Sequence, residues 1–244
     1  MTTIRRITAV TGWGSLVATS SWLWYTRQSH LQPLDHNDYL FQSTFKARLN
    51  PDNHPAMSDV CIRELPLSKI KPELLTEDGK LVEQFCAKTF GGIGICNLLE
   101  NGTKDPTDKR VILGFEAQRA LLKRSNYNTK TAHNLWTQPE LASSIYPVGT
   151  EMVDHFEIIS KTTDSIIVRC GGSPLDKNVR ASDGLFELKA DVDEDEKIAR
   201  FEMKSVFFSG ATKSAEHMVP GHIVWGHRLY TKLLMETAVR GLGV

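Results

Sequence analysis

The sequence predicts an α+β protein in which a curved antiparallel sheet packs on a long C-terminal helix. Apolar and polar residues alternate in the second half of the chain, as in strands with one buried face, and an apolar stripe with helical spacing follows near the C-terminus. The composition, with 41% hydrophobic and 24% charged residues over 244 positions, excludes a disordered or collagen-like chain. Lys plus Arg and Asp plus Glu both number 29, which also excludes a typical nucleic-acid binder.

The sequence predicts a separate N-terminal segment at residues 1–34 and a single α+β domain at residues 35–244. Ile7 to Thr26 carries no charge, Arg residues flank it on both sides, and aromatic residues cluster at its end. As a helix it would span about 30 Å, the thickness of a bilayer core. We therefore expect an anchor-like segment and membrane association through residues 7–26. A mitochondrial targeting leader, a cleaved signal peptide and a disordered arm remain open alternatives.

The first half of the domain predicts irregular structure followed by helices. Prolines interrupt residues 31–66, where only Ser58 to Leu65 resembles a strand. Helical spacing returns from Lys80 and is broken by the glycines at 91–94. These glycines lack the third position of a dinucleotide-binding loop, so they indicate a helix break or close helix packing. A second helical stretch covers 109–125.

A short helix follows, because Thr137 to Glu140 has the spacing of a capping box with Pro in the first turn.

The second half predicts four strands and the long helix. The strand-like runs are 152–160, 165–170, 184–192 and 198–208. The last two alternate most clearly and form a hairpin around an acidic loop. Pro220 precedes a helix from Gly221 to Arg240, which a glycine ends. One stripe of this helix carries Ile223, His227, Tyr230, Leu234 and Ala238.

This order of elements over residues 145–244 resembles the helix-grip architecture of Bet v 1 and START-like proteins, in which a curved sheet wraps a C-terminal helix around an apolar cavity. Several strings are also similar to a little-characterised family of filamentous-fungal proteins that are often encoded near secondary-metabolite genes. They are Tyr146–Thr150, Asp154–Glu157, Val168–Gly171, Ser182–Glu187 and Lys204–Phe208. The resemblance implies a cavity and a metabolic role, and it implies no catalytic residue.

Two histidines and a tyrosine are the candidate catalytic residues. His227 interrupts an apolar helical stripe three residues before Tyr230, and a histidine that faces a cavity can exchange a proton near neutral pH. A structural histidine bonded to a backbone carbonyl is the alternative. His155 shares one strand face with Glu157, so this pair forms an oriented base if that face lines the cavity. Otherwise Asp154 is the buried residue, and the pair lies on a solvated face.

The ligand-binding candidates combine one cation with apolar side chains. An arginine in the strand at 165–170 would clamp a carboxylate or an enolate, with a solvated side chain as the alternative. The predicted binding residues are Arg169, Phe186, Phe201, Phe207, Ile223 and Leu234.

We expect no metal site and no cofactor, since the four cysteines form no C-x-x-C pair and no zinc-type cluster with histidine. Motifs of covalent hydrolases and zinc peptidases are also missing from the sequence. The predicted function is binding of an apolar metabolite and acid/base assistance of its cyclisation or isomerisation in fungal secondary metabolism. A non-catalytic carrier, a membrane-tethered accessory factor for a partner biosynthetic enzyme, and a mitochondrial lipid-handling protein are the alternatives.

Overall fold

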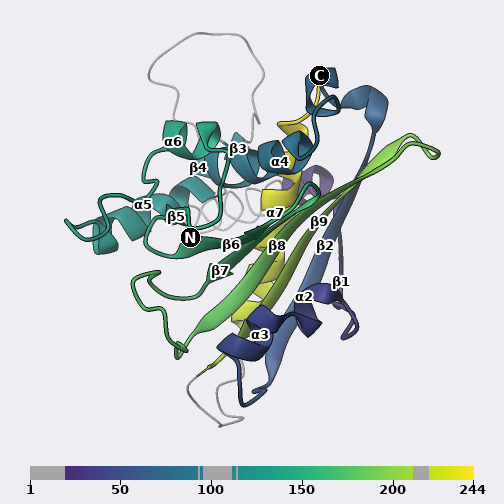
Figure 1. The fold of residues 1–244 in the computed structure, drawn as a ribbon. Helices are drawn as coiled ribbons and strands as arrows, with labels where there is room; N and C mark the ends of the chain where they lie inside the picture. Colours follow the sequence, from purple (N-terminus) through teal and green to yellow (C-terminus); the bar gives the residue numbers. More distant parts are fainter. Residues whose placement is uncertain (1–19, 93, 96–111, 114, 211–219) are drawn as a thin grey trace, which may run out of the picture.

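The computed structural model describes residues 20–92, 94–95, 112–113, 115–210 and 220–244 (Figure 1). It confirms an α+β fold with a seven-stranded antiparallel sheet and a C-terminal helix, α7 (Gly221–Arg240). The strand order is β1-β2-β9-β8-β7-β6-β5. The strands are β1 (His30–Gln32), β2 (Ala56–Pro66), β5 (Glu151–Met152), β6 (Phe156–Lys161), β7 (Ser165–Cys170), β8 (Asp183–Asp193) and β9 (Ile198–Phe208).

Helices cover both faces of the sheet (Figure 1). We call the side that carries Cys61, Phe186 and Met203 the α7 face, because these side chains share the main core with α7 and α4 (Lys80–Gly91). The opposite side, the α2 face, is covered by α2 (Tyr39–Gln42) and α3 (Thr44–Leu49). The remaining elements are α5 (Phe115–Asn126), α6 (Gln138–Ser143), the short helices η1 (Leu67–Lys69) and η2 (Pro72–Leu74), and a separate pair, β3 (Gly94–Ile95) and β4 (Ile112–Leu113).

Two helix ends lie where the sequence predicts them, at the start of α6 and at the end of α4. The capping box at the start of α6 is present, with the Thr137 hydroxyl and the Glu140 carboxylate each accepting a backbone N–H. Helix α4 ends at Gly91, where an added Cβ would lie 2.5 Å from the backbone nitrogen of Ala142. The glycines therefore end α4 and also let it pack closely on α6.

The predicted strand at 152–160 is interrupted. Val153 and Asp154 adopt positive φ angles of 48° and 52°, and the His155 N–H donates to the Met152 carbonyl at 3.1 Å. This tight turn divides the run into β5 and β6. The alternation that a continuous strand would impose on Asp154, His155 and Glu157 is therefore lost at the turn.

The prediction of a membrane-associated location through residues 7–26 is wrong. Among the residues that the structure describes, no helix is long and apolar enough to cross a bilayer. Residues 7–19 lie outside this part of the chain. Residues 20–25 are helical, and their aromatic rings contact cations of α7: Lys232 lies 5.6 Å from the ring centre of Trp22, and Arg240 lies 4.4 Å from that of Tyr25.

Candidate functional site

A buried aspartate lies beneath the first half of α7. Asp59 is on β2, directly opposite Ser205 of β9, and only 2% of its side chain is exposed. Its Oδ1 lies 3.3 Å from Nε2 of His227, and its Oδ2 lies 3.8 Å from Nε of Arg228. A carboxylate is costly to bury without such partners. Two consecutive residues of α7 therefore hold this carboxylate in place.

The histidine of this Asp59–His227 pair is partly accessible. The buried residues of α7 run from Thr231 to Val239, whereas none lies between Gly221 and Tyr230. The His227 side chain is 18% exposed, and the Phe207 ring packs edge to face against it with centroids 5.2 Å apart. The Thr231 hydroxyl donates to the His227 carbonyl at 3.0 Å, so the helix position of the histidine is also supported from the next turn.

The pair has the arrangement of an oriented general base. A carboxylate only accepts hydrogen bonds, so the Nε2 that faces Asp59 is the nitrogen that carries the proton. The lone pair then lies on Nδ1, which makes no hydrogen bond to any residue in the described part of the chain. If Nδ1 takes a proton, the adjacent carboxylate stabilises the imidazolium.

Tyr230 follows His227 by three residues on α7, but its hydroxyl group hydrogen-bonds to a different partner. Its hydroxyl donates to Oε1 of Gln118 on α5 at 2.9 Å. Burial raises the pKa of Tyr230 well above its ordinary value. The phenol therefore stays protonated and serves as a hydrogen-bond donor.

The structure separates His155 from His227. His155 precedes β6, which is four strand positions from β2 in the sheet, or about 19 Å. Burial lowers the pKa of His155, and the nearby Arg180 lowers it further against the opposing effect of Asp154. The two predicted catalytic histidines therefore cannot act on one small reacting centre.

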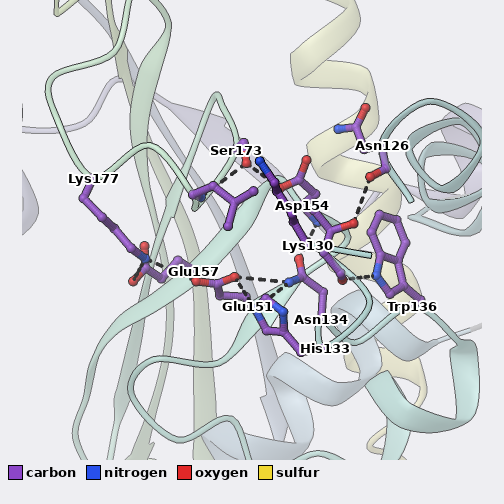
Figure 2. A network of polar contacts seen from close by, with 12 residues as sticks. Asn126, Lys130, His133, Asn134, Trp136, Glu151, Asp154, Glu157, Ser173 and Lys177 are labelled. Carbon is purple, nitrogen blue, oxygen red and sulfur yellow. Dashed lines mark hydrogen bonds and ion pairs between the residues drawn. The ribbon is translucent and has the colours of Figure 1, made fainter. Parts of the chain in front are cut away.

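A polar network around Glu151, which the sequence analysis missed, also includes Asp154, the residue before His155 (Figure 2). The Glu151 carboxylate accepts hydrogen bonds from His133 at 2.9 Å and from Asn134 at 3.1 Å. Lys177 forms ion pairs with both Glu151 and Glu157. Burial alone would raise the pKa of Glu151, but these hydrogen bonds outweigh it and lower the pKa. Three segments of the chain, at 133–134, 151–157 and 177, meet here, so no pattern among adjacent residues indicated the network.

Arg169 lies on the α2 face, away from His227. Its Nε and Nη2 donate to the two carboxylate oxygens of Asp183 at 3.0 and 2.6 Å, and Nη2 also donates to the Asn178 carbonyl at 2.5 Å. Both side chains are almost fully buried. The guanidinium that was expected to clamp a ligand is thus occupied by an internal bidentate pair.

The predicted apolar lining divides into two groups. Phe186, Phe201 and Leu234 belong to the packed main core, and α4 fills the space above two of them: Phe85 lies 5.0 Å from Phe201, and the Phe90 ring lies 6.4 Å from Phe186. Phe207, by contrast, is only partly buried at the His227 end, and Ile223 is 52% exposed. Phe207 contacts the His227 ring, and Ile223 lies one helical turn before His227 on α7, so both remain available near the Asp59–His227 pair.

Among the described residues there is also no group of three or more His, Cys, Asp or Glu side chains placed to hold a metal ion. Searches of protein-family models, curated proteins and solved structures returned no match to this chain. The resemblances to helix-grip proteins and to the fungal family therefore stay predictions.

Proposed function

We propose that this protein binds an apolar small molecule beneath the first half of α7 and moves a proton on it. The observation that carries the proposal is the Asp59–His227 pair, with a buried carboxylate behind a partly accessible imidazole. Phe207 packs against this imidazole and offers an apolar contact for the molecule. In the proposed reaction Nδ1 removes a proton from carbon or oxygen and returns it elsewhere, so the net change is a cyclisation or an isomerisation.

The strand order supports the helix-grip interpretation. The first long strand, β2, pairs with the last strand, β9, and the order then runs back through β8, β7, β6 and β5. The C-terminal helix contacts β2 and β9, its buried residues all lie in its second half, and its first half has no buried residue. In this interpretation the molecule lies at the end of the helix that the core does not fill. The resemblance to the fungal family implies that this molecule is an intermediate of secondary metabolism.

A non-catalytic carrier that presents its ligand to a partner enzyme is the second candidate. Its requirement for apolar surface is met by Phe207, which is only partly buried, and by Ile223, which is exposed. Catalyst and carrier differ in what His227 does. A carrier needs only the shape and apolar surface of the site, whereas a catalyst needs the imidazole in the transition state.

The experiment compares His227→Ala with the matched variant His222→Ala, which removes an exposed histidine from the first turn of the same helix. Binding is followed with the fluorescent probe 1-anilinonaphthalene-8-sulfonate, and turnover by metabolite profiling of strains that carry each variant. The proposal expects loss of product with H227A, nearly unchanged probe binding, and no effect of H222A. An unchanged product profile with H227A would reject catalysis. If the Phe207→Ala variant keeps both product formation and probe binding, the proposed location of the ligand is rejected.

A further inference from the structure

A cleft of about 430 Å³ opens at the β1 edge of the sheet, where the chain before β1 meets β2 and β9. Its charged lining consists of three arginines, a histidine and one glutamate: Arg27, Arg63, Arg200, His30 and Glu64. Clefts of roughly 300–1,000 Å³ hold small organic molecules. This cleft is built from different residues than the Asp59–His227 pair.

One of the three arginines is neutralised within the protein. Nη1 of Arg200 lies 3.0 Å from Oε1 of Glu64, and its Nε lies 2.8 Å from Oε1 of Glu202. Two carboxylates thus balance this guanidinium. The positive charge of the cleft must come from the other two arginines.

Arg27 and Arg63 carry charge that the neighbouring acids do not balance. Glu236 is the carboxylate nearest to Arg63, at 3.4 Å from Nε, but it also pairs with Arg240 at 3.2 Å. Arg27 contacts the carbonyl and the ring of Trp24 and forms no ion pair with any acid in the described ranges. Burial lowers the pKa of Arg63, Glu236 opposes this effect, and both Arg240 and Arg27 add to it.

The Arg63 guanidinium is held in place before any ligand arrives. Nη2 donates to Oε1 of Gln28 at 2.5 Å, and Nη1 donates to the carbonyl of Glu64. A guanidinium has five N–H donors, so donors remain for a further acceptor. Because the fork is already oriented, little side-chain entropy is lost when it binds a planar or tetrahedral oxyanion.

We propose that this cleft binds the oxyanion group, phosphate or carboxylate, of a small organic molecule between Arg27 and Arg63. The two guanidiniums supply charge and paired N–H donors for the anion. The remaining volume accommodates the organic part of the molecule. The site does not depend on the function proposed for His227.

The test titrates ¹⁵N-labelled full-length protein with inorganic phosphate and, separately, with succinate, each against sodium chloride of equal ionic strength. We expect saturable amide shifts in residues 27–32 and 62–64. Arg27→Ala should weaken binding about tenfold, the effect of losing one hydrogen bond to a charged group. Arg48→Ala, which removes an arginine that lies over Phe45, should leave it unchanged, as should His227→Ala. The anion with the lower dissociation constant shows whether the cleft prefers a phosphate or a carboxylate group.

Arg27→Lys provides a second variant, since it keeps the charge and removes the fork. It should bind more weakly than the wild type and more tightly than R27A. Absence of saturable shifts with both anions overturns the proposal. Equal losses in R27A and R48A also overturn it, because general charge screening would then explain the shifts.

Discussion

Replacing Lys204 by methionine should destabilise the protein strongly. The Lys204 ammonium is buried on the α2 face, 2.9 Å from Asp38, 3.1 Å from Glu187 and 3.4 Å from Glu202. Methionine preserves most of the apolar stem but leaves Glu187, which is itself buried, without its cation. Removing one partner of a buried ion pair costs about 3–5 kcal/mol. For a domain of this size the melting temperature should fall by roughly 10 °C.

The control is Lys189→Met on the same face. Lys189 is more exposed, and it pairs with Asp191 at 2.7 Å and with Asp164 at 3.7 Å. A partly exposed pair of this kind contributes about 0–1 kcal/mol. Urea unfolding followed by circular dichroism at pH 7 gives both free energies. Equal losses in K204M and K189M would refute the reasoning. Adding Glu187→Gln to K204M should recover part of the loss, because it removes the stranded charge.

The pH dependence of this ion pair has a definite sign. Burial alone would lower the pKa of Lys204, but the carboxylates of Asp38 and Glu187 outweigh it and raise the pKa. A raised pKa in the folded state gives stability that is complete below the ordinary lysine pKa of about 10.4 and is lost at higher pH. The difference between K204M and the wild type should therefore be constant from about pH 6 to pH 9.

Two further predictions concern a helix contact and the polar network. Gly91→Ala should destabilise by about 1–3 kcal/mol, since its Cβ would lie 2.5 Å from a backbone nitrogen of α6; Gly226→Ala in α7, with nothing within 4 Å, should stabilise by about 0.5–1 kcal/mol in the same urea assay. Glu151→Gln should cost about 0.5–1 kcal/mol at pH 7, after allowance for solvent screening. Burial alone would raise the pKa of Glu151, but hydrogen bonds from His133 and Lys177 outweigh it and lower the pKa, so this cost should disappear as the pH falls well below the ordinary glutamate pKa of about 4.3. An E151Q cost that persists there would contradict the role of ionised Glu151.

The sequence by itself determined the elements whose signals are local. The hairpin of β8 and β9 follows from alternation along each strand, and α7 follows from one apolar stripe between Pro220 and Gly241. The capping box at Thr137 and the end of α4 at Gly91 depend on neighbours within a few residues. Such patterns act through backbone geometry that adjacent residues impose, so they can be read in order along the chain.

Only the tertiary structure decided which side chains meet. His227 stood out in its stripe, but its carboxylate partner, Asp59, is 168 positions earlier and is brought to it by the pairing of β2 with β9. The alternation around Arg169 did not show that both faces of its strand are buried, and the pairing of β7 with β8 brings Asp183 to it. The sequence showed no partner for the uncharged residues 20–26. In the structure, Lys232 and Arg240 of α7 contact the rings of Trp22 and Tyr25. Contacts between distant segments depend on the strand order, which local sequence patterns do not encode.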